Sequence, residues 1–348
     1  MTVRVMAAVL SLALIGSASA KSLDIFFIDV EGGESTLIVT AARESLLIDA
    51  GYGGRGGRDP ARILAAAREA GLDHIDYLLI THFHNDHVGG VPELAALIPI
   101  DAFLDYGEPL GTDRMTAAAF RNYEPIRSQH RHFQLKPGDH LPLKGVDVDI
   151  VSAAGVVLSK SLPGGGQKNP ACVTLENQPE DGTENFRSIG LRLRFGAFRF
   201  VDLGDLSGNT LGSLVCPTNP LGTASVYLVP HHGNFDSNVP AVIAALRPRV
   251  AVMNNGATKG GAPESFATLH RQYGLEDLWQ LHASRNQHAD NSADSFIANV
   301  DEGQTGYWIK LTANDEGSFT LFNGRNGFSK TYLANGDKGK APRDRRSP

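Results

Sequence analysis

The sequence predicts an α/β fold, and three observations lead to this prediction. Apolar runs of strand length alternate along the chain with segments that carry helix start and stop signals. About 310 of the 348 residues remain once the two chain ends are set aside, which is enough for one large α/β domain or two fused halves. No internal repeat of fixed period interrupts the alternation.

The first half of the chain predicts a strand meander, a helix, and then a buried strand. Asp59 is the expected N-cap of the helix because Pro60 follows it in the first turn, and Gly71 is expected to end the helix. The expected strands are 23–30, 35–40, 45–49 and 75–81, and further helices are expected at 91–97 and 115–127.

The second half predicts a long loop followed by strands. Residues 159–182 lack periodicity and contain Pro163 before three glycines, which is typical of a surface loop. Alternating segments around Gly196 and Ala197 predict a hairpin, and the segment 315–317 predicts the turn of another. The expected strands are 188–195, 198–203, 225–229, 249–253, 307–312 and 318–322.

The two chain ends are not expected to belong to the fold. Residues 1–20 have the features of a signal peptide: Arg4, an apolar stretch of eleven residues, and small residues before the cleavage point at Ala20. Eleven apolar residues are too few to span a bilayer, and no nearby cysteine offers a lipid anchor. We therefore expect a secreted or periplasmic protein, with a single domain at 21–335 and a basic disordered tail at 336–348.

The charge balance limits the expected partners. Without residues 1–20 the chain has 38 Asp and Glu against 31 Lys and Arg, a net charge of −7. The tail holds five basic and two acidic residues, so the folded body is near −10. Such a body argues against a surface that grips nucleic acid, because that affinity depends on Lys and Arg. A small-molecule substrate is the expected partner, and the oligomeric state is left open.

Cys172 and Cys216 are the two cysteines of the chain. In an oxidising compartment they can pair, which would tie the middle of the chain to the segment before Pro217. Two buried free thiols are the alternative. Neither cysteine has the spacing of a metal-binding pair.

The most informative segment runs from His82 to His87. It places four metal-capable side chains within six residues, after an apolar run and before two glycines. Imidazole suits zinc, and a carboxylate adds charge and orients a bound water. A strand that ends in a loop presents His82 and His84 toward one side. The following turn then carries Asp86 and His87 to a second position, roughly 3.5 Å away. A set of polar surface side chains is the alternative interpretation.

Two further strand ends offer ligands. Asp205 follows Gly204 at the end of an apolar strand, and it either bridges two cations or caps a helix that begins at Ser207. His231 and His232 end another strand. Adjacent histidines point in different directions, so one can ligate a metal while the other faces the substrate or a carboxylate.

Taken in order, these motifs resemble the metallo-β-lactamase superfamily and, within it, the hydrolase domain of ComEC-type competence proteins. The matching segments are 27–34, 47–51, 81–90, 203–205 and 229–233, with a weaker match at 248–256. The resemblance implies a four-layered αββα sandwich and two zinc ions, or manganese ions, per chain. It assigns Asp205 to the bridging position, and it alone favours His232 over His231 as a ligand. The implied metal ligands are His82, His84, Asp86, His87, Asp205 and His232.

The chain departs from that subfamily at several positions. The usual Gly-Gln-Gly-Asp reads Gly32-Gly33-Glu34 with Glu31 ahead, and Asn234 stands where a serine normally follows His-His-Gly. Many superfamily members add a histidine before the bridging aspartate, where this chain has Asn185 and Ser188. The first metal would then be held by fewer protein ligands and more water, unless another histidine reaches it. The candidates are His130, His132 and His140.

Other residues are expected around the centre. Asp49 ends a strand beside the motif, and we expect it to orient a ligating histidine. Arg55 and Arg58 lie in a glycine-rich loop without the ending of a phosphate-binding loop. They either reach an anionic substrate or are solvated loop charges. His288 either lines the cleft or is a polar loop residue.

The implied function is an exported metal-dependent hydrolase. Two cations that share Asp205 lower the pKa of a bound water toward neutrality, and the hydroxide attacks an acyl or phosphoryl centre. The catalytic candidates are Asp86, which accepts a hydrogen bond from this nucleophile, and His231, which faces the substrate. A small anionic ester is the expected substrate, and a phosphodiester is favoured over a β-lactam. The alternatives are a β-lactamase, an exported nuclease and a non-catalytic binding module.

Overall fold

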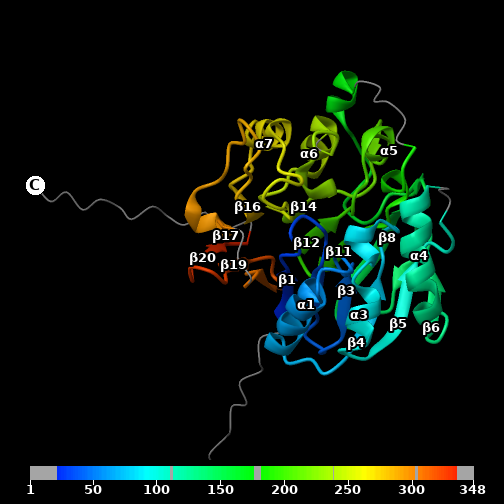
Figure 1. Cartoon of the computed structure of the whole chain (residues 1–348). Helices are drawn as coiled ribbons and strands as arrows, with labels where there is room; N and C mark the ends of the chain where they lie inside the picture. Colours follow the sequence, from blue (N-terminus) through cyan, green and yellow to red (C-terminus); the bar gives the residue numbers. More distant parts are fainter. Residues whose placement is uncertain (1–21, 110–112, 176–181, 238, 302–304, 335–348) are drawn as a thin grey trace, which may run out of the picture.

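Two nine-stranded sheets face each other, and helices cover their outer faces (Figure 1). The computed structural model describes residues 22–109, 113–175, 182–237, 239–301 and 305–334. The predicted four-layered αββα arrangement is therefore confirmed. The predicted signal peptide and basic tail lie outside the described residues.

The first sheet joins the beginning of the described chain to its end. Strands β20 to β3 are antiparallel neighbours, whereas β3, β4, β5 and β6 run parallel. In spatial order the strands are β20 (Ser329–Tyr332), β19 (Phe319–Asn323), β18 (Ile309–Asn314), β1 (Ser22–Phe27), β2 (Thr36–Val39), β3 (Ser45–Ile48), β4 (Ile75–Leu79), β5 (Ile100–Asp105) and β6 (Arg131–Gln134).

The second sheet has a parallel half from β12 to β17 and an antiparallel half from β12 to β7. Its strands in spatial order are β17 (Ile297–Asn299), β16 (Asp277–His282), β15 (Val250–Met253), β14 (Val226–Val229), β12 (Phe198–Asp202), β11 (Gly190–Phe195), β8 (Asp147–Ala153) and β7 (His140–Leu141), and β9 (Val156–Val157) also pairs with β8. A separate ladder joins β10 (Gln167–Lys168) to β13 (Thr218–Asn219).

The helices form the two outer layers (Figure 1). The first sheet carries α1 (Arg58–Glu69), α2 (Asn85–Val88), α3 (Val91–Ala95) and α4 (Arg114–Arg127), and the second carries α5 (Gly208–Ser213), α6 (Pro240–Leu246) and α7 (Pro263–His270). Short 3₁₀ turns are η1 (Pro170–Thr174), η2 (Asn185–Arg187), η3 (Pro230–Gly233) and η4 (Asp294–Phe296). None of the helices in the described ranges combines the length and apolarity that crossing a membrane would require.

Aromatic side chains fill the space between the two sheets. The ring of Phe27 on β1 meets that of Phe200 on β12 at 5.8 Å between centroids, and Phe198 meets Phe319 at 5.5 Å. Such edge-on pairs bury large apolar areas and fix the two sheets against each other. A second apolar cluster lies on the outer face of the second sheet, where Phe266 of α7 is fully buried.

The packing brings the functional segments to one edge of the sandwich. In a parallel sheet the carboxyl ends of neighbouring strands lie together, and ligands bind at that edge. The first sheet contributes the ends of β3 and β4, and the second contributes the ends of β12, β14 and β15. The parallel halves of both sheets therefore determine where the candidate residues meet.

The predicted role of Asp59 as an N-cap is wrong. Helix α1 begins at Arg58, and Gly57, in the left-handed region at φ 73°, is its N-cap. Asp59 is buried in the first turn, where its carboxylate accepts a hydrogen bond from the backbone N–H of Tyr52 at 2.8 Å. The helix dipole stabilises a carboxylate in the first helical turn. The hydrogen bond from Tyr52 shows that Asp59 holds the loop before the helix and does not cap the helix.

The long loop predicted at 159–182 is partly ordered by short elements. It contains β10 and η1, and Cys172 of η1 forms a disulfide with Cys216. Pairing, rather than two free thiols, is therefore what the structure shows. Strands and helices that were not expected from the sequence are β5, β6, β7, β8, β9, β10, β13, β16, β17, β20, α2, α6 and α7.

Candidate metal centre

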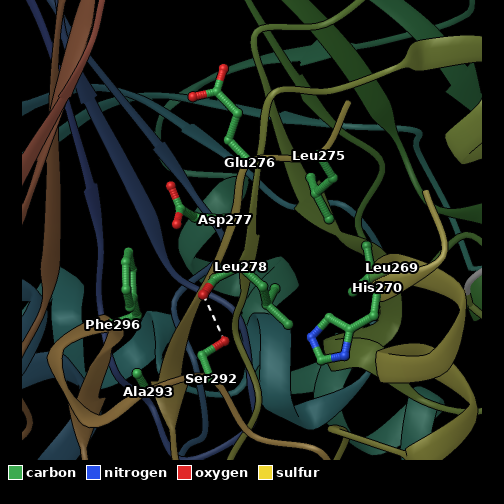
Figure 2. Close-up of a pocket in the computed structure, with 9 residues that line it drawn as sticks. All are labelled: Leu269, His270, Leu275, Glu276, Asp277, Leu278, Ser292, Ala293 and Phe296. Atoms are coloured by element: carbon green, nitrogen blue, oxygen red, sulfur yellow. Dashed lines mark hydrogen bonds between the residues drawn. The ribbon is translucent and has the colours of Figure 1, made fainter. Parts of the chain in front are cut away.

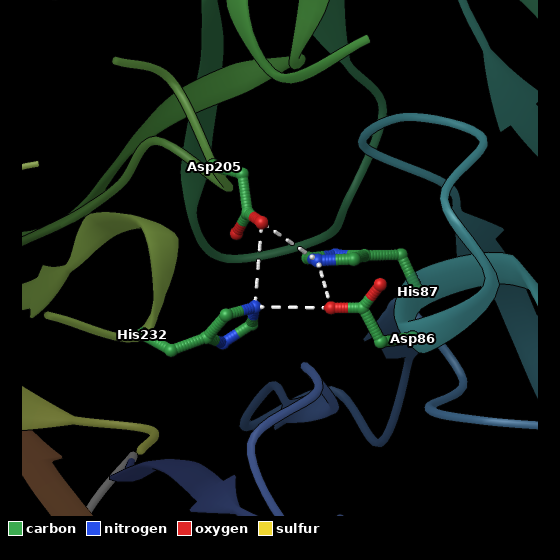
Figure 3. A group of neighbouring side chains, drawn as sticks. All are labelled: Asp86, His87, Asp205 and His232. Atoms are coloured by element: carbon green, nitrogen blue, oxygen red, sulfur yellow. Dashed lines mark ion pairs between the residues drawn. The ribbon is translucent and has the colours of Figure 1, made fainter. Parts of the chain in front are cut away.

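Four buried side chains converge at the edge between the two sheets (Figure 3). Nε2 of His87 lies 3.3 Å from Oδ2 of Asp86 and 3.2 Å from Oδ2 of Asp205. Nε2 of His232 lies 3.2 Å from Oδ2 of Asp86 and 3.3 Å from Oδ2 of Asp205. One ligand atom from each residue lies within 4.8 Å of the other three, so a single cation can contact all four.

The environment of these ligand atoms suits a bound cation. Nε2 of His87, Nε2 of His232 and Oδ1 of Asp205 are buried without a hydrogen-bond partner in the part of the chain that the structure describes. Leaving a buried polar atom unpaired costs about 1–3 kcal/mol, so such atoms persist where an ion or ligand satisfies them. Imidazole nitrogens and carboxylate oxygens are the donors that zinc and manganese take.

A second group of side chains adjoins the first through Asp205. Nε2 of His82 lies 2.9 Å from Nδ1 of His84 and 3.9 Å from Oδ2 of Asp205. Nε2 of His231 lies 3.8 Å from the same oxygen and 3.3 Å from Nδ2 of Asn185. Oδ1 of Asn185 is buried and lacks a hydrogen-bond partner among the described residues. Asp205 therefore stands between two groups of potential ligands, the geometry that a bridging carboxylate needs.

Unusual backbone conformations hold the second-sheet residues in place. Gly204 has φ 54°, and a Cβ atom there would lie 3.0 Å from the side chain of Thr81, so the turn that presents Asp205 requires glycine. His231 and His232 have φ 49° and 55°, in the left-handed region that non-glycine residues rarely adopt. Each such residue costs about 1–3 kcal/mol, and such strain concentrates at functional sites.

Buried carboxylates support the centre from behind. Oδ2 of Asp49, at the end of β3, lies 2.6 Å from Nδ1 of His87 and accepts a hydrogen bond from the hydroxyl of Thr81 at 2.6 Å. Glu34 and Asp202 are both fully buried near the same histidine. Burial and the neighbouring charges of Asp202 and Asp49 raise the pKa of Glu34 well above its usual value. These groups leave a surplus of acid around His87.

The pKa values of the residues in the centre reflect this surplus of carboxylates. Burial lowers the pKa of His87, but Asp205, Asp86 and Asp49 outweigh burial and raise it well above its usual value. Burial raises the pKa values of Asp86 and Asp205, but their histidine neighbours hold both well below the usual range. The carboxylates thus stay ionised, and one proton on His87 balances only part of their charge. A divalent cation offsets such a cluster better than one proton does.

The other predicted histidines lie away from this centre. His130, His140 and His288 are exposed, and Nε2 of His132 lies 2.8 Å from Oδ1 of Asp105. None of them reaches Asp205 or His82. These three candidate histidines therefore do not complete the first metal site, and Asn185 is a polar residue that lies beside His231.

The two predicted arginines make contacts of their own. Arg58 pairs with Asp59 at 2.5 Å and donates to the carbonyl of Val30 at 3.2 Å, so its guanidinium serves the base of the loop. The guanidinium carbon of Arg55 lies 4.5 Å from the centroid of the Tyr52 ring. These contacts occupy the Arg58 guanidinium within the protein, and Arg55 lies against Tyr52; a substrate contact of either arginine stays a prediction.

The cation that contacts the centre is Lys259, which the sequence reading missed. Its Nζ forms an ion pair with Oδ2 of Asp86 and donates a hydrogen bond to the hydroxyl oxygen of Tyr52 at 3.2 Å. The available signal was a lysine directly before a glycine pair, Gly260 and Gly261, and three residues after the weak match at 248–256.

A separate cavity of about 350 Å³ lies between α7 and β16 (Figure 2). Its carboxylate Asp277 already accepts a hydrogen bond from Tyr332 at 2.6 Å and pairs with Lys330. The hydroxyl of Ser292 donates to the carbonyl of Leu278 at 2.8 Å. These polar groups are satisfied within the protein, so we assign no chemistry to this cavity.

Comparison with protein-family models gives a match over residues 28–146 to the model described as the metallo-beta-lactamase superfamily. That stretch contains the whole segment from His82 to His87 and also Asp49.

Curated relatives match over shorter stretches. The chain is 40% identical over 67 residues to an atrochrysone carboxyl ACP thioesterase of Aspergillus terreus, covering 19% of this chain and 20% of that protein. It is 46% identical over 55 residues to a hydroxyacylglutathione hydrolase of Aliivibrio salmonicida, covering 16% and 21%. The matched stretches thus span about a fifth of each relative's own length.

Among solved structures, the metallo-beta-lactamase fold protein YhfI of Bacillus subtilis is similar. The identity is 9%, the TM-score is 0.45, and the match covers 74% of this chain and 95% of that one.

Proposed function

We propose that this chain, a hydrolase of the metallo-beta-lactamase superfamily, is exported and cleaves a small anionic ester at a dinuclear zinc or manganese centre. The observation that carries the proposal is the convergence of Asp205 and His232 on the segment from His82 to His87. These residues come from three strand ends in two sheets, and polar side chains do not gather in the interior without a partner.

Each ligand has a defined place in this proposal. His82 and His84 would hold the first cation, and Asp86, His87 and His232 would hold the second. Asp205 would serve both, since its Oδ2 lies within 4 Å of histidines from both groups. Asn185 would offer an amide oxygen to the first position, where a histidine stands in many superfamily members. Asp49 orients His87 and increases its basicity as a ligand.

When bound, two such cations supply a hydroxide at neutral pH and polarise the oxygen of the scissile bond. The residues of the chain then hold and orient the reacting groups. Asp86 would orient the nucleophile by accepting a hydrogen bond with the carboxylate oxygen that is not a ligand. The His231 side chain is 13% exposed, and its Nδ1 lies 2.9 Å from Oδ1 of Asp236, which fixes the orientation of the ring.

The phosphodiester and carboxylic ester classes both fit this centre. The ComEC-type resemblance of the motifs favours the phosphodiester. The similarity to a named thioesterase and to a hydroxyacylglutathione hydrolase favours a carboxylic ester or thioester as the second candidate. The acidic body argues against long nucleic acid as the substrate.

Export is supported by two features of the chain. Residues 1–20 have the charge, apolar length and small-residue ending of a signal peptide. The disulfide between Cys172 and Cys216 suits an oxidising compartment.

The experiment that tests the function is hydrolysis by metal-loaded protein of four chromogenic probes. These are bis(p-nitrophenyl) phosphate, a p-nitrophenyl carboxylic ester, a small thioester and nitrocefin. We expect turnover of the phosphodiester or of the carboxylic esters, abolished by chelator and restored by zinc or manganese. Nitrocefin turnover far above the other three would make the protein a β-lactamase, and no turnover at full metal occupancy would make it a binding module.

A further inference from the structure

Lys259 occupies the boundary between the buried ligands and solvent. Its Nζ forms an ion pair with Asp86, lies 3.2 Å from the hydroxyl oxygen of Tyr52, and is 5.3 Å from the centroid of that ring. The Lys259 side chain is 38% exposed, whereas that of Asp86 is 12% exposed. The ammonium therefore reaches the centre from its solvent side.

Close backbone contacts hold Lys259 at this place. The N–H of Gly256 donates to the carbonyl of Lys259 at 2.9 Å, which closes a tight turn. A Cβ atom on Gly32 would lie 2.9 Å from the Cβ of Lys259, and one on Gly260 would lie 2.0 Å from the carbonyl oxygen of His232. The turn that carries the lysine is thus packed directly against the turn that carries a candidate ligand.

The ion pair with Asp86 competes with metal binding for the same oxygen. Oδ2 of Asp86 is the atom that faces both His87 and His232. A divalent cation on that oxygen repels an ammonium that shares it. Lysine has a flexible four-carbon stem and three donors, so the ammonium can turn to another anion within reach. The open side of the centre is where such an anion arrives with the substrate.

We propose that Lys259, together with the hydroxyl of Tyr52, binds a negatively charged group of the substrate next to the scissile bond. The inference rests on the proposed hydrolase function and names a feature of its substrate: a carboxylate or phosphate that follows the reacting centre by a short spacer. An ammonium and a phenol side by side provide a charge-assisted and a neutral hydrogen bond to one such anion. Lys259 is then the specificity-determining residue of the centre.

The test compares two p-nitrophenyl esters with the same leaving group and nearly the same shape. Mono-p-nitrophenyl succinate carries a carboxylate where p-nitrophenyl butyrate carries a methyl group. Lys259→Gln should lower kcat/KM for the succinate ester roughly 10- to 100-fold, mainly through KM, because a hydrogen bond to a charged group is lost. The butyrate ester should change by less than about 3-fold. Lys259→Arg should restore most of the preference because it keeps the charge.

Lys310→Gln is the matched control. Nζ of Lys310 pairs with Oδ2 of Asp24 at 2.9 Å and lies 5.0 Å from the centroid of the Phe26 ring, so its partners resemble those of Lys259. It lies on β18, which carries no residue of the metal centre among those described. Both esters should be hydrolysed by this variant as by the unchanged protein.

Metal content separates a substrate role from support of Asp86. Lys259→Gln should keep its bound zinc, or bind it more tightly, because a competing cation has been removed. An equal loss of activity toward both esters, or a loss of zinc, would show that Lys259 supports Asp86 as a metal ligand. Either result would overturn the inference.

A binding measurement keeps the inference testable if the hydrolase proposal fails. Should the zinc-loaded protein hydrolyse neither ester, calorimetric titration with succinate and, separately, with inorganic phosphate still reports on Lys259. Binding of one of these anions should be roughly 10-fold weaker in Lys259→Gln than in the unchanged protein. The anion that loses affinity tells whether the substrate group is a carboxylate or a phosphate. Equal affinity in both proteins for both anions would refute the role of Lys259 independently of turnover.

Discussion

Oδ2 of Asp49 lies 2.6 Å from Nδ1 of His87, across the ends of the neighbouring parallel strands β3 and β4. Asp49 itself adopts a left-handed φ of 59°, and its other oxygen accepts the backbone N–H of Thr81 at 2.8 Å. The carboxylate therefore fixes both the ring orientation and the tautomer of the histidine, leaving Nε2 directed at Asp86 and Asp205.

Asp49→Asn should weaken zinc binding about 10- to 100-fold, because an amide orients the imidazole without increasing its basicity. Competition with a chromogenic chelator measures the change. Asp147→Asn is the control, since Asp147 is a half-exposed carboxylate paired with Arg194. Equal zinc affinity in Asp49→Asn and the unchanged protein would show that Asp49 does not contribute to zinc binding.

Asp205→Asn should abolish hydrolysis and release at least one metal while the fold is kept. A carboxylate shared by two dications offsets their repulsion, and an amide cannot do so. If Asp205 only capped α5, its loss would cost about 1 kcal/mol and leave activity intact. In the structure, Ser207 is the N-cap residue of α5. Elemental analysis, circular dichroism and turnover together distinguish the two roles, and activity within a few-fold of normal would favour the cap.

The purified protein should contain about two zinc or manganese ions per chain, as the two adjoining ligand groups require. Removal by chelator should lower the Tm, because the buried carboxylates Asp86 and Asp205 then lack a dication. Elemental analysis and thermal unfolding check this. Protein purified without chelator that holds no transition metal, and takes up none on titration, would contradict the metal centre.

Stability should fall at alkaline pH because of a second buried cluster. Nη1 of Arg62 lies 3.0 Å from Oδ2 of Asp29, and Nε2 of His282 lies 3.3 Å from Oε2 of Glu31. Burial lowers the pKa of His282, but the close carboxylates of Asp29 and Glu31 outweigh it and raise the pKa to about 9. The close imidazole of His282, with the nearby positive charges, lowers the pKa of Glu31 to about 2.

Because folding raises the pKa of His282 from 6.5, its contribution is fully present below pH 6.5 and is lost as the pH rises through about 9. We expect the free energy of unfolding to drop by at most about 3 kcal/mol over that range. Glu31 acts in the opposite direction, contributing above pH 4.5 and losing its effect toward pH 2. Denaturant unfolding at several pH values measures both. The alkaline drop in the free energy of unfolding should vanish in His282→Gln. It should persist in His140→Gln, where the replaced histidine is exposed. A drop that persists in both variants would show that His282 does not cause it.

Protein recovered from the periplasm or medium should begin at Lys21, because the small residues before it form a cleavage site. N-terminal sequencing of the native protein tests this, and thiol titration before and after reduction tests the disulfide. Intact Met1 on soluble cytoplasmic protein from the native host would refute export.

Some parts of the fold were readable because their signals are local. The alternation of strands and helices, the hairpin around Gly196, and the helix expected at 115–127 follow from periodicity and turn residues that lie within a few positions. Strand β8 begins with the alternating pattern Asp-Val-Asp-Ile and was available to the same reasoning. Strand β5 was harder, since five of its six residues are buried and it shows no alternation.

The sequence by itself indicated the candidate ligands of the centre. The segment from His82 to His87 carries its ligand spacing within six residues, and strand-end motifs made Asp205, His231 and His232 candidates. Only the family resemblance favoured a bridging Asp205 and the choice of His232. Only the tertiary structure decided which charges accompany them. Lys259 reaches Asp86 across 173 positions, and Arg58 turns to its neighbour Asp59. Contacts of this kind depend on how two sheets and their glycine turns pack, and side-chain direction at the end of a loop has no local signal in the chain.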